Sequence, residues 1–414
     1  MFGCSRTLKA VLGASHRAIS YIQAVDRHGR TFAIPSNTGS ATIDATATPW
    51  GSLKMDVSDS LYWPTGNDAV LAPYGTVLLP FRGAVLPPNT AGAPALGNGQ
   101  TRKTPHGGLY LGTIWGTAEL CPLGQFRVTA SELQESAKDG TVVASVTAKD
   151  FTEVIKRNLF VDPFTIAGGT RTSHAILAIL RDRFHAGVFP TMPRIHFINK
   201  VSGSDDAIIQ VTQNFGVLTG ATQRPDPWTD LLKLAASIGA WLFTDARGNW
   251  VLEPIPEPRR KSSVWKIVEG NGGTLLGADR TLDDEKTHNG IILTCHHRKI
   301  KPFRVEVWDT NPHSATYYLG PFGKSPKMVT TKLCATHAQA MVMARSLFKA
   351  NCGFTDTVSV TCPPMPAIEI GDVVTLKRAR LGIDEPYVVD GIVVPFNIDS
   401  DMTVTMRPQA AFLK

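Results

Sequence analysis

Two glycine turns, one in each half of the chain, constrain this sequence more than any other feature. The first lies in residues 71–79 around Gly75, and the second lies in residues 367–376 around Gly371. In each, the glycine is followed by a small polar residue and then by a β-prone run. This pattern predicts two related β-domains in one chain. A glycine turn before a strand is common, so the pattern alone leaves a chance resemblance open.

Length and composition agree with a multidomain, β-rich protein. A chain of 414 residues predicts roughly two to four domains. Hydrophobic residues make up 43% and charged residues 19%, so a sizeable core can be buried. The chain holds 36 glycines and 28 prolines, which is more than usual and favours many turns.

The charge of the chain is mildly basic. A formal net charge of +7 permits a polyanion nearby but does not show one, because no dense basic run accompanies it. The nearest candidates are residues 259–261 (Arg-Arg-Lys) and residues 296–301 (His-His-Arg-Lys-Ile-Lys). A solvated linker or an edge strand explains both segments more simply.

The six cysteines, at positions 4, 121, 295, 334, 352 and 362, form no CxxC motif and have no zinc-like spacing. They are too few for a disulfide scaffold, so we expect reduced, packed thiols and synthesis in the cytoplasm. Residues 1–9 lack the pattern of a secretory leader. The longest apolar runs, such as residues 175–180, are too short to cross a bilayer, so we expect no membrane span.

Strand and helix patterns divide the chain into three parts. Residues 1–150 alternate like β-strands, with a hairpin at residues 21–34 and a strand at residues 41–48. Within this first domain, residues 87–108 are rich in Pro, Gly, Asn and Thr and show no periodicity. We expect either a flexible surface loop there or a loop that a partner orders.

Residues 151–262 read as a mixed α/β domain. Thr172 and Ser173 are suited to cap a helix over residues 174–184, and a second helix fits residues 228–238, with Pro227 in its first turn. A hairpin at residues 241–252 and a proline-rich linker at residues 254–258 follow.

Residues 263–414 read as β again, with one helix at about residues 336–350 that Thr336 caps. A β-domain, a mixed domain and a second β-domain therefore account for the whole length.

No complete catalytic motif occurs. The chain contains no GxSxG nucleophile elbow and no HExxH zinc motif. Gly323, Lys324 and Ser325 match the end of a phosphate-binding loop, but Tyr318 stands where that loop requires its first glycine. We therefore expect an irregular extended loop there.

Metal-binding patterns are also incomplete. His174, His185 and His196 recur at a regular interval, but two of them on one helix would lie about three turns apart. Residues 295–297 (Cys-His-His) offer two ligands on one face and no third. Residues 283–285 (Asp-Asp-Glu), flanked by Arg280 and Lys286, fit a solvated turn. We expect no catalytic, cofactor-binding or metal-binding residues and no cofactor, and an enzyme is disfavoured.

A resemblance to a known family lies in the order of several turn-and-strand patterns. These patterns occupy residues 71–75, 122–128, 238–245, 289–294, 307–312, 317–323 and 366–374. Together they resemble the tail hub (minor tail) proteins of long-tailed phages that infect actinobacteria. The resemblance covers nearly the whole chain, and residues 87–108 fit it least and are expected to be an insertion.

This resemblance implies a fold and a role. Tail hub proteins resemble the baseplate hub of contractile phages and carry two similar β-barrels with a smaller mixed domain. Three copies form a ring that presents six barrels, which matches the sixfold tail tube to a threefold tip. The resemblance thus implies a structural, non-enzymatic virion protein at the distal tail tip, assembled in the host cytoplasm. It also implies that the turns at Gly75 and Gly371 are related by a rotation near 60° about the ring axis.

The same resemblance implies a set of partners. These are two further copies of the chain, a distal tail or tail tube protein, the tape-measure protein, and downstream tail-tip or fibre proteins. Genomic DNA would pass through the lumen during ejection, with weak, salt-sensitive contact at most.

Two other functions remain open from the sequence. One is a tail module that binds host-surface glycans through aromatic residues around Tyr317, Tyr318 and Trp63, although ordinary β-core packing explains such residues as well. The other is a tail-associated hydrolase of the cell wall.

Overall fold

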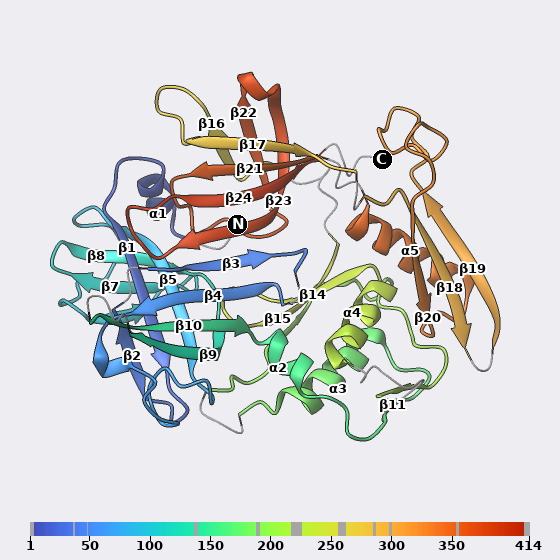
Figure 1. Ribbon diagram of the computed structural model, residues 1–414, viewed down its shortest axis with the longest axis horizontal. Helices are drawn as coiled ribbons and strands as arrows, with labels where there is room; N and C mark the ends of the chain where they lie inside the picture. The colour runs from blue at the N-terminus through green and yellow to red at the C-terminus, as the bar shows by residue number, and fades with distance from the viewer. Residues whose placement is uncertain are drawn as a thin grey trace.

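The computed structural model covers the 414-residue chain (Figure 1). The structure describes all of it except residues 1–3, 36–37, 48, 136–139, 188–190, 217–225, 256–261, 285–286, 298–299, 353–355 and 410–414. β-strands are the main regular structure of the described residues, with five α-helices among them. The basic residues 259–261 and the end of the proline-rich linker lie outside the described residues, as do residues 298–299 of the second basic segment.

One sixteen-stranded sheet dominates the molecule. From the first part of the chain it takes β1 (Ala18–Val25), β2 (Thr31–Ile34), β3 (Ser40–Asp44), β4 (Gly51–Val57), β5 (Val77–Val85), β6 (Thr101–Lys103), β7 (Leu109–Thr113), β8 (Gly116–Pro122), β9 (Phe126–Glu135) and β10 (Val142–Asp150). From the last part it takes β16 (Trp265–Val268), β17 (Gly277–Leu282), β21 (Asp356–Cys362), β22 (Val373–Arg378), β23 (Ile383–Pro395) and β24 (Met402–Pro408).

The strand order is β17-β21-β24-β23-β3-β4-β10-β9-β5-β8-β7-β6, with β1 and β2 branching from β5, and β22 and β16 branching from β23. Because this path has two open ends, the described strands form no closed barrel. The expectation of two separate β-barrels is corrected to two strand units that share one sheet. Their side chains also share one hydrophobic core, which runs from Leu8 to Met406.

The two strand units repeat the same pairing. In the first unit, β3, β4, β10, β9 and β5 lie side by side; in the second, β17, β21, β24, β23 and β22 do so. The equivalent strands also follow the same order along the chain. We call these the first and second units below.

The glycine turns occupy equivalent places in the two units. Gly75 and Gly371 both have positive φ, +129° and +77°, a region that favours glycine. The carbonyl of the next residue then accepts a hydrogen bond of 2.9 Å, from Val128 N–H to Thr76 and from Val389 N–H to Asp372. The repeat that the sequence predicted is therefore present in the backbone hydrogen bonds.

A β-bulge supports the same equivalence. The β9–β10 register shifts between Thr147 and Ala148, and the β23–β24 register shifts between Val389 and Gly391. Counted from the glycine-turn pairing, the extra residue is Thr129 in the first unit and Asp390 in the second. Since a bulge bends a strand at a particular residue, a shared position indicates that both units curve alike.

The second part of the chain forms an α/β body at the lower right of Figure 1, beside the first unit. It contains α2 (Thr152–Arg157), β11 (Phe164–Ile166), α3 (Thr172–Phe184), β12 (Phe197–Asn199), β13 (Gln213–Phe215), α4 (Pro227–Ser237), β14 (Ala240–Thr244) and β15 (Trp250–Pro254). A separate core surrounds Trp228 and Trp250. The second predicted helix is confirmed, with Pro227 in its first turn and Asp226 as its cap.

The predicted cap of α3 is wrong. Thr172 and Ser173 lie inside the first turn, and Arg171 precedes it without a capping side chain. Asp206, far along the chain, accepts from the Ser173 N–H (2.9 Å) and hydroxyl (2.6 Å) instead. A tertiary contact thus provides an acceptor for a backbone N–H group that has no partner within the helix.

A third lobe lies at the right of Figure 1, with its helix against α4. It consists of β18 (Gly290–His297), β19 (Ile300–Trp308) and β20 (Pro326–Thr331), covered by α5 (His337–Asn351). Thr336 caps α5 by accepting from Gln339 N–H, as the sequence predicts. The chain enters this lobe after β17 and returns at β21, so the lobe is an insertion between two strands of the second unit.

Residues 87–108 are ordered by contacts within the chain. Residues 101–103 form β6, which pairs with β7. Gly99 N–H donates to Gly112 O (2.9 Å), and the Thr117 hydroxyl donates to Pro94 O (2.7 Å). The expectation of a flexible or partner-ordered loop is corrected, because the neighbouring β7–β8 hairpin supplies the partners that the segment's own sequence does not reveal.

Candidate functional site

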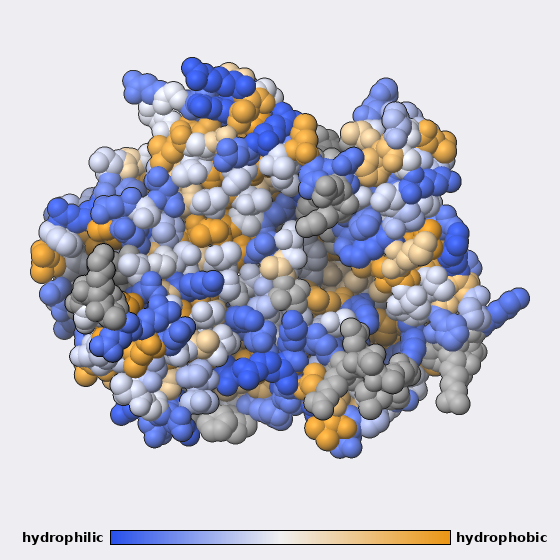
Figure 2. All heavy atoms as spheres, in the orientation of Figure 1, coloured by the Kyte–Doolittle hydropathy of each residue, from blue (hydrophilic) through white to orange (hydrophobic). Residues whose placement is uncertain are grey.

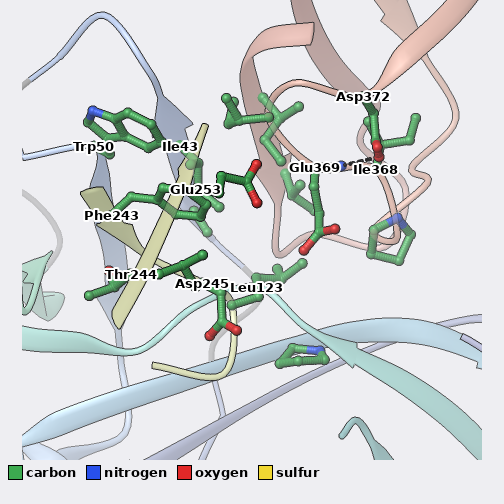
Figure 3. Close-up of a pocket in the computed structure, with 18 of the residues that line it drawn as sticks. Ile43, Trp50, Leu123, Phe243, Thr244, Asp245, Glu253, Ile368, Glu369 and Asp372 are labelled. Atoms are coloured by element: carbon green, nitrogen blue, oxygen red, sulfur yellow. Dashed lines mark hydrogen bonds between the residues drawn. The ribbon is translucent and has the colours of Figure 1, made fainter. Parts of the chain in front are cut away.

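A cavity of about 310 Å³ lies where the two units meet the middle body (Figure 3). Its lining comes from β3 and β23 of the sheet, from the β14–β15 hairpin, and from the turn before Gly371. The residues labelled in Figure 3 are Ile43, Trp50, Leu123, Phe243, Thr244, Asp245, Glu253, Ile368, Glu369 and Asp372. The cavity therefore lies between three parts of the chain and not within one of them.

Aromatic rings close one side of this cavity. Trp50, which follows β3, stacks on Phe243 of β14 with the ring centroids 5.0 Å apart and an angle of 11°. Trp241 meets the same indole edge-on at 5.7 Å. Such pairs add about 0.5–1.5 kcal/mol each beyond the apolar area they bury. The cluster thus ties the first unit to the middle body.

Four carboxylates also line the cavity, among mostly apolar residues. Asp245 accepts hydrogen bonds from the backbone N–H groups of Arg247 and Asn249 (2.9 and 2.8 Å), and Glu253 pairs with Lys200 at 2.6 Å. Asp372 accepts from the backbone N–H of Glu369 (3.0 Å) and so shapes the turn before Gly371. Each of these three carboxylates therefore has a hydrogen-bond or ion-pair partner within the chain.

Burial raises the pKa of Glu369 above its ordinary value, because the charged form loses contact with water. The residues that line the cavity include no histidine, cysteine or serine. Among the residues that the structure describes, no group of three potential ligands is placed to hold a metal ion. The arrangement is that of a packed interdomain junction with an acidic wall.

Arg82 provides a second link between the two units. This arginine of β5 is almost fully buried, at 1% exposed, and its guanidinium donates to backbone carbonyls at the β23–β24 turn. The acceptors are Pro395, Asn397 (2.9 Å), Ile398 (3.2 Å) and Ser400 (3.4 Å). Burial lowers the pKa of Arg82 to about 10, so the side chain stays charged near neutral pH.

The histidines singled out in the sequence do not converge on one site. His174 is exposed on α3, and His185 is the residue that follows the same helix. His196 lies before β12, where its Nδ1 is 3.1 Å from Asn249 Oδ1. Cys295 is buried in the third lobe on β18.

The phosphate-loop remnant and the tyrosines lie together in the third lobe. Lys324 stands 5.6 Å from the Trp308 ring and 5.7 Å from the Tyr318 ring, and Tyr317 meets Tyr318 edge-on at 5.4 Å. Trp63 instead packs against the first core. The structure thus splits the proposed glycan-binding set between two parts of the molecule.

Figure 2 shows hydrophilic residues mixed with hydrophobic patches on the drawn face, including patches over the strands of the second unit. No described helix is long and apolar enough to span a bilayer. The distribution of hydrophilic and hydrophobic residues on the drawn face therefore does not indicate where a functional site lies.

Two sheet edges are more informative. Among the described strands, β9 beyond Arg127 pairs only with β10, and β17 pairs only with β21. Sequence reasoning missed these edges, because an unpaired edge is a property of the assembled sheet. The doubled glycine turn was the signal that could have led to them.

The sequence matches no protein-family model, and a search of curated proteins finds no match. The fold, however, is similar to solved structures. One is the 43 kDa tail protein of prophage MuSo2 from Shewanella oneidensis, with a TM-score of 0.58, 11% identity, and coverage of 95% of this chain and 99% of that one. Another is a tail protein from Neisseria meningitidis MC58, with a TM-score of 0.59, 10% identity, and coverage of 95% and 98%. The chain thus shares, over nearly its whole length, the fold of these two tail proteins.

Proposed function

We propose that this chain is a structural hub protein of a phage tail tip, without enzymatic activity. The fold shared with two tail proteins over 95% of the chain supports this role. The role requires no catalytic residue, cofactor or metal. Residues 1–150, 151–262 and 263–414 serve as its three domains.

The observation that carries the proposal is the repeated strand unit. Each chain holds two units with the same strand order, the same register and the same bulge position. Three chains would present six such units, so a threefold ring would match a sixfold tail tube. The turns at Gly75 and Gly371 would then be related by a rotation near 60° about the ring axis.

In this role the chain forms a homotrimer between the tail tube or distal tail protein and the downstream tip or fibre proteins. Its lumen passes the tape-measure protein and then genomic DNA. The mildly basic charge of +7 permits weak, salt-sensitive contact with DNA, and tight binding would hinder passage. The proposed location is the distal tail tip of the virion, after assembly in the host cytoplasm.

The test is the mass and symmetry of the purified chain, alone and with its tail partners. Light scattering should give three times the chain mass of 44.8 kDa, and electron microscopy should show a threefold ring. A chain that remains monomeric and never joins a tail-tip particle would overturn the proposal.

A further inference from the structure

The internal repeat shows which edge of each unit is occupied within the chain. In the second unit, the β23 edge beyond the bulge is covered by β3 of the first unit, with Gly391 opposite Asp44, Ile392 opposite Ile43 and Val394 opposite Ala41. The equivalent edge in the first unit is the end of β9, residues 130–135. The equivalent of β3 in the second unit is β17.

Within the described part of the chain, neither the end of β9 nor β17 has the neighbour that its equivalent strand has. Among the described strands, β9 beyond Arg127 pairs only with β10, and β17 forms one end of the sheet. No described strand therefore occupies on β9 the position that β3 occupies on β23, and no described strand pairs with the outer edge of β17, which corresponds to β3.

Exposure follows the same pattern. Val394 on the covered edge is 1% exposed, whereas Leu133 at the equivalent place on β9 is 39% exposed. Ile43 of β3, the strand that pairs with β23, packs against the core, whereas its equivalent on β17, Leu282, is 72% exposed. Long edges with exposed apolar side chains invite pairing with another chain.

We propose that β17 of one copy pairs, antiparallel, with the β9 edge of a second copy of this chain. This proposal rests on the proposed function, because it names the contact through which copies would join into a ring. The repeat sets the register, with Ser131 opposite Leu282, Glu132 opposite Thr281, and Leu133 opposite Arg280. Each copy offers one β17 and one β9, so the contact is head-to-tail and generates a closed ring where the rotation closes.

The hydrogen-bond pattern follows from the β3–β23 pairing within the chain. Ala45 N–H donates to Asp390 O and Phe396 N–H donates to Gly39 O, both at 2.9 Å. These two bonds lie at the two ends of the β3–β23 pairing. Because hydrogen-bonded and non-hydrogen-bonded pairs alternate along antiparallel strands, Ile392–Ile43 and Val394–Ala41 are hydrogen-bonded pairs, and Val393–Thr42 between them is a non-hydrogen-bonded pair.

By the same alternation, Leu282 and Arg280 direct their backbone groups to β9 of the second copy. Glu132 and Thr281 form the close pair, with Cα atoms about 4.5 Å apart. That separation lies within the range that a disulfide spans.

The experiment is disulfide cross-linking between two single variants. Glu132→Cys and Thr281→Cys proteins are purified separately, mixed in equal amounts, oxidised mildly and run on a non-reducing gel. We expect a covalent dimer in the mixture and not in either variant alone, and a series of covalent oligomers from the double variant. The unmodified chain controls for the native cysteines, of which five are buried and Cys4 is half-buried.

A register control uses Glu132→Cys mixed with Leu282→Cys. These positions lie on opposite faces of the proposed sheet, since a shift of one residue reverses the side-chain direction. We expect at least a tenfold weaker dimer band from this mixture. Equal bands from both mixtures would overturn the proposed register.

Light scattering of the same mixtures separates this proposal from the proposed function. Trimers without the in-register cross-link would overturn the edge pairing and leave the hub role standing. Monomers without the cross-link would count against both.

Discussion

Ile392 of β23 lies directly opposite Ile43 of β3, in the middle of the strand pairing that joins the two repeated units into one sheet. Both side chains also line the cavity between the units and the middle body. This cross-strand pair, like the neighbouring pair of Val394 and Ala41, thus lies both where the two units join and at the cavity beside the middle body. The stability of the whole chain should depend on it.

Shortening Ile392, which is 6% exposed, tests that dependence. We expect Ile392→Ala to lower the free energy of unfolding by about 2–4 kcal/mol, because it removes buried methyl groups and enlarges the cavity. Urea titration followed by fluorescence measures the change. Ile398→Ala, at a position that is 51% exposed, should change stability by less than about 0.5 kcal/mol. Equal effects from the two variants would contradict the role of this strand pairing.

Arg82 offers a test of the second link. Arg82→Met keeps most of the side-chain volume but leaves the carbonyls of Asn397 and Ile398 without their donor. We expect a loss of about 3 kcal/mol, since buried acceptors left unpaired cost about 1–3 kcal/mol each. Thermal unfolding gives the comparison, with exposed Arg102→Met as the control, for which little change is expected. An Arg82→Met variant with unchanged stability would show that these hydrogen bonds do not stabilise the contact between the two units.

The pH dependence of stability should carry a contribution from Asp150. This carboxylate is buried, accepts from the N–H groups of Gly51 (2.7 Å) and Thr152 (3.0 Å), and has its pKa raised to about 6 by burial. Between its unfolded pKa near 3.8 and about 6, the folded state holds a proton that the unfolded state has lost. Stability from this group is therefore greatest at low pH and declines as pH rises through that window.

Asp150→Asn cannot titrate, so it isolates this contribution. The stability advantage of the unmodified chain over Asp150→Asn should shrink by on the order of 2 kcal/mol between pH 4 and pH 7, at about 1.4 kcal/mol per pKa unit. Urea midpoints at several pH values measure it. A difference that is constant across this range would show that the Asp150 pKa is the same in both states.

Assembly should respond to the backbone of β17 more than to its side chains. Leu282→Pro removes an N–H that faces the free edge, so we expect the oligomer to be lost while the fold remains. Leu282→Ala keeps that N–H and should still assemble. Light scattering reports the oligomer, and circular dichroism confirms the fold. Assembly of a folded Leu282→Pro variant would argue against pairing through β17.

The sequence predicted some elements well because their signals are local. Pro227 in the first turn of α4 and Thr336 as the cap of α5 are confirmed, and each lies within or next to its helix. The cap of α3 was mispredicted because Asp206 approaches it from a distant loop. The order in residues 87–108 was missed for the same reason, since β7 and β8 supply its partners.

The repeat illustrates the division most clearly. The turns at Gly75 and Gly371 are visible in the sequence, because a positive φ selects glycine wherever it is needed. The equivalence of Ala41 with Arg280 is not visible, because a small apolar and a long charged side chain share no chemistry, and the match of Val394 with Leu133 is too common among strands to reveal theirs. Ala41 and Val394 are buried where the two units join, whereas Arg280 and Leu133 are exposed on β17 and β9.

The sequence by itself thus determined the turns, most helix positions and the β-rich character, because backbone conformation and local hydrogen bonds select particular residues. Tertiary structure alone decided that the two units share one sheet, that Arg82 links them, and that β9 and β17 are left with open edges. Strand pairing joins residues hundreds of positions apart through backbone groups that every residue carries. The sequence of one strand therefore does not specify its neighbour.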